Sequence, residues 1–200
     1  MVDTAPDFVF ALSAMLAEFD LPDVDRGFVM LTVGKGSEHL IRSTLAHVGA
    51  DAGLYENAMA RYQHHYRIVN GQHSTVYPGV QAGLDRLAAR GLKLACLTNK
   101  PTAFAVALLQ AKGLARYFEH VFGGDAFERR KPDPLPLVKT CEALGCAPAQ
   151  TLMIGDSSND TQAARAAGCP VVLVTYGYNH GRPVAEAGAD ATVDSLEQIA

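Results

Sequence analysis

LMIGDSSND, at residues 152–160, is the most informative segment of this chain. Its apolar half is typical of a buried strand, which is followed by Asp156 and, four residues later, by Asp160. In open parallel sheets, ligands bind beyond the carboxyl ends of the strands. We therefore expect Asp156 to leave a strand, Asp160 to lie in the next turn or helix start, and both carboxylates to face one crevice.

From residue 78 onward, helix-like and strand-like segments alternate. We predict helices at 78–90, 101–112, 134–144 and 161–167, and strands at 92–98, 120–122, 151–154, 171–174 and 191–193. Strands separated by helices pair in parallel through right-handed crossovers. This part of the chain is therefore expected to be α/β, a doubly wound parallel sheet.

The first third of the chain has a different pattern, because apolar residues recur there at helical spacing and no strand-like alternation is convincing. The recurring residues are Phe8, Leu12, Met15, Leu16, Phe19, Leu40, Ile41, Leu45, Val48, Tyr55, Met59, Tyr62 and Tyr66. We predict two domains: an α/β core made of residues 1–7 and 76–200, and an all-helical domain made of residues 8–75.

Composition excludes several classes of protein. The 200 residues carry 17 basic and 21 acidic side chains, a net charge of −4, and the longest basic run is at 129–131, so no nucleic-acid partner is expected. No window approaches the roughly 20 apolar residues of a membrane span, and no signal segment opens the chain. The four cysteines form no C-x-x-C pair. We expect a cytoplasmic protein without a membrane partner, and the sequence does not determine its oligomeric state.

Polar side chains gather at three places in the α/β part of the chain where strands are predicted to end or turns to follow. Thr98 and Asn99 end one strand, just before a helix whose first N–H groups can bind an anion. Lys131 lies in a turn stiffened by prolines and is suited to neutralising phosphate oxygens or a carboxylate. Asp156 and Asp160 offer the oxygen ligands that a hard divalent cation needs. Together they predict a phosphate and metal site.

Each motif also has a purely structural interpretation. A Thr-Asn pair at a strand end can cap a helix, a Lys-Pro pair can form a surface turn, and the acids at 156 and 160 can cap a helix. The glycine-rich segment at 34–37 is not a nucleotide-binding loop, because it has neither the required spaced glycine nor a preceding strand.

In this order along one α/β chain, the motifs resemble the second, third and fourth motifs of the haloacid dehalogenase-like phosphatases, a superfamily of magnesium-dependent phosphohydrolases. Residues 2–7 resemble the segment that follows the family's nucleophile motif, residues 8–72 its inserted helical cap, and residues 77–79 the return into the core. The segments at 31–36 and 175–181 are most similar to those of the phosphoglycolate phosphatase type.

The resemblance implies a role for each polar residue of the α/β part. Thr98 would hydrogen-bond the transferring phosphoryl group, with Asn99 beside it. Lys131 would stabilise charge on the nucleophile and the phosphate. Asp156 would bind Mg²⁺ directly, and Asp160 would act on the metal through a bound water or an outer contact.

The resemblance also implies a substrate. A small phosphorylated metabolite, 2-phosphoglycolate, would be hydrolysed through an aspartyl-phosphate. The loop containing Lys35 and Gly36 would close over it and help to select it. Whether Lys35 binds a substrate carboxylate or is a solvated lysine in a glycine turn stays open at this point.

The family's first motif, an apolar strand that ends in Asp-x-Asp, has no counterpart in these 200 residues. Its first Asp is the nucleophile and its second the general acid and base, and its strand lies between those that here end at Thr98 and Asp156. We expect a chain truncated before this first central strand and inactive as it stands. Deliberate omission of the upstream residues and a true loss in a pseudoenzyme are the alternatives.

Three other functions fit parts of the same sequence. A related phosphatase for a sugar phosphate, pyrophosphate or phosphonate keeps the fold and changes the substrate. A phosphate-binding pseudoenzyme would retain the ligand through Thr98 and Lys131 without turnover. A response-regulator receiver domain is disfavoured by the separate helical segment and by the late position of the acids at 156 and 160.

Overall fold

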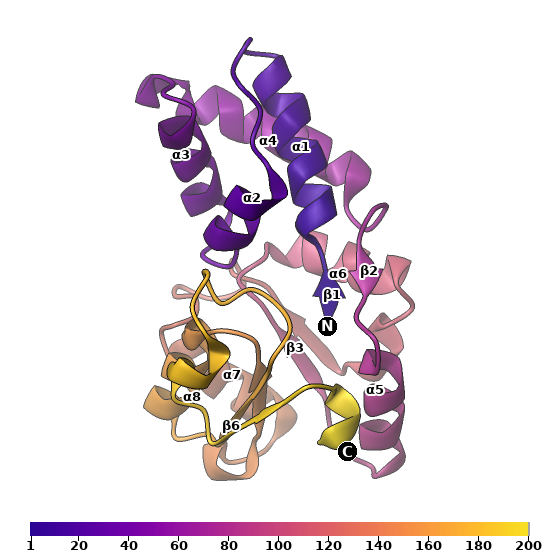
Figure 1. Cartoon of the computed structure of the whole chain (residues 1–200). Helices are drawn as coiled ribbons and strands as arrows, with labels where there is room; N and C mark the ends of the chain where they lie inside the picture. Colours follow the sequence, from indigo (N-terminus) through magenta and orange to yellow (C-terminus); the bar gives the residue numbers. More distant parts are fainter. Residues whose placement is uncertain (200) are drawn as a thin grey trace. The chain divides into compact units, whose positions relative to one another are not determined.

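The chain divides between residues 75 and 76 into two units, each with its own interior (Figure 1). One consists of Met1 and Val76–Ala200, and the other of Val2–Thr75. The computed structural model describes residues 1–199. Residues 2–7, which the sequence analysis places in the α/β core, group with the helices instead.

The Val2–Thr75 unit is mainly helical. Its elements are β1 (Val2–Asp3), α1 (Ala5–Ala17), α2 (Arg26–Thr32), α3 (Ser37–His47), the 3-10 turn η1 (Ala52–Leu54), α4 (Tyr55–Val69) and the first residue of β2 (Thr75–Val76). Strands β1 and β2 pair with each other in a two-stranded sheet. Neither strand was predicted from the sequence, because two residues are too few for an alternating pattern to be visible.

Helices α1 and α4 lie side by side and form the interior of the helical unit (Figure 1). Phe8 stacks on Tyr66 with ring centroids 4.9 Å apart, and Leu12, Met15 and Tyr62 are fully buried. These residues belong to the predicted apolar stripes. Helix periodicity therefore identified the buried face of each helix.

Asp7 is a buried carboxylate at the start of α1. It accepts hydrogen bonds from the backbone N–H groups of Gly71 and His73, both at 2.7 Å, and from the hydroxyl of Ser74. A buried charge is tolerated when donors surround it in this way. Asp7 therefore fixes the segment after α4 against the start of α1, which explains why residues 2–7 belong to the helical unit.

The second unit alternates helices and strands. Its elements are α5 (Val80–Ala89), β3 (Ala95–Leu97), α6 (Thr102–Ala111), η2 (Ala115–Tyr117), β4 (His120–Phe122), α7 (Leu135–Leu144), η3 (Pro148–Gln150), β5 (Met153–Gly155), α8 (Ser158–Ala167), β6 (Val171–Val174), η4 (Val184–Ala187), β7 (Ala191–Val193) and η5 (Leu196–Gln198). Every predicted element of this part is present. Strand β3 is three residues long, shorter than the predicted range, and α8 begins three residues earlier than predicted.

All strand pairs of the second unit for which a register is determined are parallel, which confirms the α/β prediction. Strand β3 pairs with β4, and a separate ladder has the order β5-β6-β7. Within residues 1–199, no ladder joins β3 to β5. The further central strand that the sequence analysis places between them stays a prediction.

Helices α7 and α8 cover these strands. Helix α7 packs on β3 and β4, and α8 on β5 and β6. Their apolar faces meet in a cluster that contains Leu137 and Cys141 from α7, Ala164 from α8, and Met153 and Leu173 from the strands. No helix in the described part of the chain combines the length and apolar character of a membrane span.

Candidate functional site

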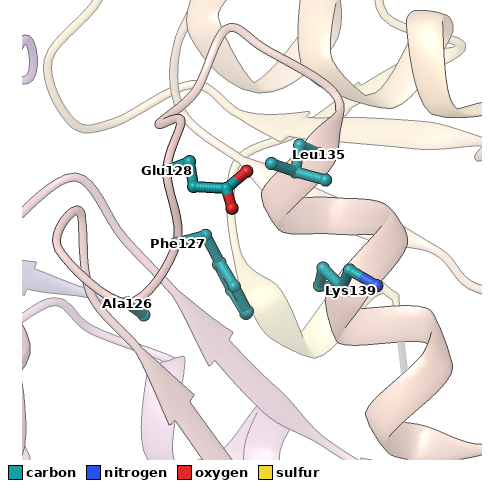
Figure 2. A pocket seen from close by; sticks show the side chains of 5 residues that line it. All are labelled: Ala126, Phe127, Glu128, Leu135 and Lys139. Carbon is teal, nitrogen blue, oxygen red and sulfur yellow. The ribbon is translucent and has the colours of Figure 1, made fainter.

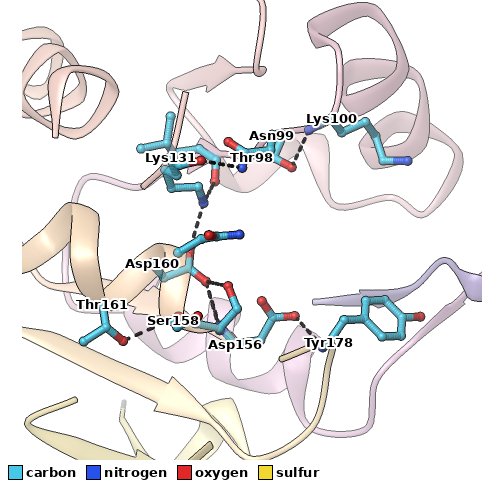
Figure 3. Close-up of polar contacts among 12 residues, drawn as sticks. Thr98, Asn99, Lys100, Lys131, Asp156, Ser158, Asp160, Thr161 and Tyr178 are labelled. Atoms are coloured by element: carbon cyan, nitrogen blue, oxygen red, sulfur yellow. Dashed lines mark hydrogen bonds and ion pairs between the residues drawn. The ribbon is translucent and has the colours of Figure 1, made fainter. Parts of the chain in front are cut away.

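The carboxyl end of β3 contributes the first part of the site (Figure 3). Thr98 follows the last strand residue, and its N–H continues the ladder by donating to Phe122 O at 2.9 Å. Its hydroxyl accepts the Lys100 N–H at 3.2 Å, and the Asn99 amide donates to Lys131 O at 2.8 Å. Hydroxyl and amide groups therefore stand at the strand tip, as the sequence predicts.

The helix that follows this strand tip is capped by protein atoms. The N–H and the hydroxyl of Thr102, at the start of α6, both bind Asp125 Oδ1, at 2.7 and 2.6 Å. From the sequence, the N–H groups of this helix start were expected to be available to an anion. That expectation is wrong for Thr102, because a carboxylate from the loop after β4 already occupies its N–H group.

Lys131 joins the two halves of the site (Figure 3). Its ammonium group donates to Leu97 O and to Asp160 Oδ1, both at 2.7 Å. The Lys131 side chain is 9% exposed and that of Asp160 is 6% exposed, so the pair is shielded from solvent. Lys131 therefore connects the end of β3 with the start of α8 and leaves Asp160 electrically compensated.

Asp160 lies in the first turn of α8 and has both carboxylate oxygens occupied. Besides Lys131, it accepts hydrogen bonds from the N–H groups of Asp156 and Ser157 at 3.1 Å and from the Ser157 hydroxyl at 3.0 Å. A Cβ on Gly155 would lie 2.3 Å from Asp160 Cβ, so only glycine fits there. The capping interpretation of this motif is therefore correct, and the carboxylate serves both the helix and Lys131.

Asp156 is the second acid and is contacted by a loop that the site prediction left out. The Tyr178 N–H donates to Asp156 Oδ2 at 3.2 Å. Gly177 has a φ of +113°, and a Cβ there would lie 2.3 Å from Asp156 Oδ2. The Asn179 side chain accepts the Ser158 N–H at 2.9 Å and donates to Arg182 O at 3.0 Å. Asn179 therefore holds this loop against α8.

The two acids differ in their electrostatics. Burial, followed by the nearby Asp160 carboxylate, raises the pKa of Asp156 to about 6. Burial alone would also raise the pKa of Asp160, but the ammonium group of Lys131 lowers it below its ordinary value. Asp160 is thus ionised and compensated, whereas the charge of Asp156 is under-compensated.

A divalent cation fits this donor set at Asp156. Mg²⁺ is bound well by a carboxylate oxygen whose negative charge is under-compensated. Within residues 1–199, the hydrogen bond that Asp156 accepts comes from the Tyr178 N–H and occupies one oxygen, Oδ2. Asp160, with both oxygens engaged, fits an indirect role. Within residues 1–199, no group of three or more His, Cys, Asp or Glu side chains surrounds a common point, so the protein atoms described supply only part of a coordination shell.

Comparison with known proteins identifies the family. The family model described as haloacid dehalogenase-like hydrolase matches residues 1–174. The chain belongs to this family. The haloacid dehalogenase-like hydrolase is 46% identical to a phosphoglycolate phosphatase of Thiobacillus denitrificans, over all of this chain and 89% of that protein. It is 44% identical to a plasmid-encoded phosphoglycolate phosphatase of Cupriavidus necator, over all of this chain and 87% of that protein.

Solved structures agree with this assignment. The crystal structure of a predicted phosphoglycolate phosphatase from Haemophilus somnus 129PT superposes with a TM-score of 0.95 at 31% identity, covering all of this chain and 91% of that one. The crystal structure of a protein described as a putative β-phosphoglucomutase from Thermotoga maritima superposes with a TM-score of 0.78 at 25% identity, covering all of this chain and 91% of that one. The likeness confirms the α/β fold of the hydrolase.

Two residues of the predicted site lie in the other unit. Lys35 is exposed in the turn between α2 and α3, and Gly36 precedes α3 with a φ of +91°. The structure thus brings together Thr98, Asn99, Lys131, Asp156 and Asp160, all in the α/β unit. Lys35 and Gly36 remain a prediction based on resemblance.

A shallow pocket of about 380 Å³ lies elsewhere on the α/β unit of the hydrolase (Figure 2). Leu135 and Lys139 of α7 line it together with Ala126, Phe127 and Glu128. It includes none of the five residues at the strand ends. We assign it no role in the reaction.

Proposed function

We propose that this hydrolase is a magnesium-dependent phosphomonoesterase that acts on 2-phosphoglycolate through an aspartyl-phosphate. Its membership of the family and its likeness to proteins named phosphoglycolate phosphatase support the reaction class and the substrate. The observation that carries the proposal is the position of the Lys131 ammonium group, 2.7 Å from both Leu97 O and Asp160 Oδ1. The Lys131 ammonium group thereby connects the end of β3, where we propose that phosphate binds, with Asp160 of the acid pair that we propose for the metal.

Each residue has a distinct task in the proposed reaction. The Thr98 hydroxyl and the Asn99 amide would bind non-bridging phosphoryl oxygens and fix the phosphorus atom in line for attack. The buried ammonium group of Lys131 would compensate the negative charge that gathers on those oxygens. Asp156 would hold Mg²⁺, which when bound supplies Lewis-acid stabilisation of phosphate charge. Asp160 would keep Lys131 in place.

The proposed chemistry has two displacements. A carboxylate oxygen forms a bond to phosphorus while the bond from phosphorus to the ester oxygen breaks, and the leaving oxygen takes a proton to become the alcohol. Water then forms a bond to phosphorus while the bond from phosphorus to the carboxylate oxygen breaks, which releases inorganic phosphate and restores the carboxylate. Neither acid of the site is assigned as nucleophile, because Asp160 is held by Lys131 and Asp156 is assigned to the metal. We therefore expect the 200-residue chain to bind phosphate without cleaving an ester.

Substrate choice and location are part of the same proposal. Lys35, an exposed cation in a glycine-flanked turn, is the residue we propose for the substrate carboxylate. All four cysteines are free thiols, which suits the reducing cytoplasm that we propose as the location.

Phosphate release tests the proposal. The hydrolase is assayed, both as the 200-residue chain and with any codons upstream of Met1 included, with 2-phosphoglycolate, a sugar phosphate, pyrophosphate and a phosphonate, in Mg²⁺ and in a chelator. We expect Mg²⁺-dependent release that is fastest from 2-phosphoglycolate. Turnover that persists in the chelator would contradict the proposed Mg²⁺ dependence. Faster phosphate release from another compound would make that compound the preferred substrate in place of 2-phosphoglycolate. Phosphate binding without any turnover would support the pseudoenzyme instead.

Two variants test the assignment of Lys131. In whichever form of the protein releases phosphate in that assay, Lys131→Met should lower kcat/KM about 10²–10³-fold, the usual cost of removing a group that stabilises transition-state charge. Lys139→Met is the matched control, because Lys139 is an exposed lysine of α7 that pairs with Glu142 at 2.8 Å. Equal activity of the two variants would remove Lys131 from the proposed site.

A further inference from the structure

Two thiols from distant parts of the chain meet in the interior of the α/β unit. The Sγ atoms of Cys141 and Cys169 lie 3.9 Å apart, although the residues are 28 positions apart in sequence. Cys141 is 1% exposed and belongs to α7, and Cys169 is 3% exposed and lies two residues before β6. Both belong to the apolar cluster under α7 and α8. Packing has therefore placed a thiol pair at non-bonded contact distance.

The position of this pair along the chain gives it a link to the site. The segment between the two cysteines contains β5 and α8, and with them Asp156 and Asp160. A covalent bond between the thiols would close a loop of chain that carries both acids. Closing a loop lowers the conformational entropy of its opened states. Such a bond would consequently restrain local opening of the segment that holds the acids.

We propose that Cys141 and Cys169 form a reversible disulfide when the hydrolase meets a small-molecule disulfide such as oxidised glutathione. A sulfur–sulfur bond forms between the two Sγ atoms, the sulfur–sulfur bond of the reagent breaks, and both protein thiol protons end on the two reagent thiols. The protein pair is oxidised and the reagent is reduced. The proposal is independent of the function proposed above.

The geometry requires only a small rearrangement. A disulfide has a sulfur–sulfur distance of about 2.05 Å, so the Sγ atoms must approach each other by roughly 2 Å from their present separation. Rotation of the two thiols about their Cα–Cβ bonds moves the sulfur atoms by distances of this order. Neither thiol has to cross the protein to meet its partner.

The same burial makes the reaction slow. Burial, followed by the neighbouring Cys141 thiol, raises the pKa of Cys169 to about 12, and the thiolate is the form that attacks a disulfide. Cys146 is half-buried just beyond α7, so the reagent reaches it first. We expect rapid mixed-disulfide formation at Cys146 and slower closure of the internal pair.

Mass spectrometry of the oxidised chain tests the proposal. The hydrolase is incubated with oxidised glutathione, quenched with an alkylating agent and digested with trypsin. Cleavage after Lys139 and Arg165 places Cys141 and Cys146 on one peptide and Cys169 on the next. We expect the two peptides to be linked, with the loss of two hydrogen atoms, and the link to open on reduction.

Three variants identify the partners. Cys146→Ser should keep the link, whereas Cys141→Ser and Cys169→Ser should each abolish it. A link that persists in Cys141→Ser, or that is lost in Cys146→Ser, would overturn the assignment. So would a wild-type chain that stays unlinked after Cys146 has been fully modified.

Amide hydrogen exchange measures the consequence in the Cys146→Ser background, which lacks the half-buried thiol and keeps the buried thiols Cys96, Cys141 and Cys169. Amides of β5 and α8 should exchange several-fold more slowly in the oxidised than in the reduced protein, because the closed loop opens less often. Exchange in α1 and α4 should be unchanged. Equal exchange of β5 and α8 in the two states would overturn the proposed restraint on local opening. The disulfide itself is decided by the mass spectra.

Discussion

The ammonium group of Lys131 lies 2.7 Å from a carboxylate oxygen of Asp160, and both side chains are less than a tenth exposed. The pair connects two strand ladders that form separate sheets within residues 1–199, since Lys131 also binds Leu97 O at the end of β3. A buried pair of this kind adds little net stability, but removing one partner leaves an uncompensated charge. The Lys131–Asp160 ion pair therefore belongs to the candidate site and also contributes to holding the fold together.

Lys131→Met should lower the free energy of unfolding by about 3–5 kcal/mol, because Asp160 would keep its charge in a buried position without its cation. Urea denaturation at neutral pH measures the change. Lys139→Met, which breaks an exposed pair with Glu142, should change the free energy of unfolding far less, because solvent screens that pair. Equal losses in the two variants would show that the Lys131 pair is not shielded from solvent.

Gly177→Ala should be more destabilising than Gly188→Ala. Both glycines have positive φ, +113° and +75°, so each substitution carries a backbone cost of about 1–2 kcal/mol. At Gly188 a Cβ meets nothing within 4 Å, whereas at Gly177 it would lie 2.3 Å from Asp156 Oδ2. We expect Gly177→Ala to lose about 1–3 kcal/mol more, a cost typical of strain at a packed site. Similar denaturation midpoints for the two variants would argue against close packing of this loop on Asp156.

Glu18 should make the helical unit sensitive to acid. Hydrogen bonds from Arg61 and then from His65, the latter at 2.5 Å, lower its pKa from 4.5 to about 2. Because the folded-state pKa is lowered, the stabilisation is fully present above pH 4.5 and is lost as the pH falls through about 2. The stability difference between the wild type and Glu18→Gln should therefore shrink across this window.

Carboxyl-carbon NMR gives a direct check on Glu18. Its resonance should titrate with a midpoint near 2. Glu56→Gln serves as a control in the acid-unfolding series, since Glu56 is exposed in the first turn of α4. The window from about pH 5 to about pH 2 spans the ordinary and the lowered pKa of Glu18. If the difference in unfolding free energy between the wild type and Glu18→Gln stayed constant across this window, the link between the ionisation of Glu18 and stability would be refuted.

Much of the α/β unit could be predicted because its elements have a regular period and end at glycine. Strands β4, β6 and β7 match their predicted ranges, and α7 ends at Leu144 before Gly145 in the left-handed conformation. The start of α8 was placed too late, because residues 158–160 are polar and show no apolar period. Only the capping contacts of Asp160 reveal that the helix begins there.

A candidate site residue could be predicted only where a local pattern, a strand end or a proline turn, marks its position. Thr98, Lys131, Asp156 and Asp160 were predicted as site residues and lie together in the α/β unit, but the contacts of Asp125 with Thr102 and of Tyr178 with Asp156 join residues 22 or 23 positions apart. No local pattern reports such a contact, since it depends on which loops the sheet brings together. Three-dimensional structure is also what assigns residues 2–7 to the helical unit, through the hydrogen bonds of Asp7 to residues 71–74.

Asp156→Asn should stabilise the metal-free protein at neutral pH. The pKa of Asp156 is raised to about 6 by burial and then by Asp160, so its ionisation costs stability as the pH rises from 3.8 through about 6. An amide can still accept the Tyr178 N–H but carries no charge. We expect a gain of about 1–3 kcal/mol at pH 7, from 1.36 kcal/mol per pKa unit, that fades below pH 4.

Magnesium should reverse the order of the two proteins. If Asp156 holds the cation, Mg²⁺ raises the wild-type melting temperature by binding the folded state only, and it leaves Asp156→Asn unchanged. Glu186→Gln, which removes an exposed carboxylate of η4, should respond like the wild type. Thermal melts with Mg²⁺ and with a chelator measure both effects. A metal response retained by Asp156→Asn would place the cation elsewhere, whereas a metal-free variant no more stable than the wild type would show that the Asp156 charge is already compensated.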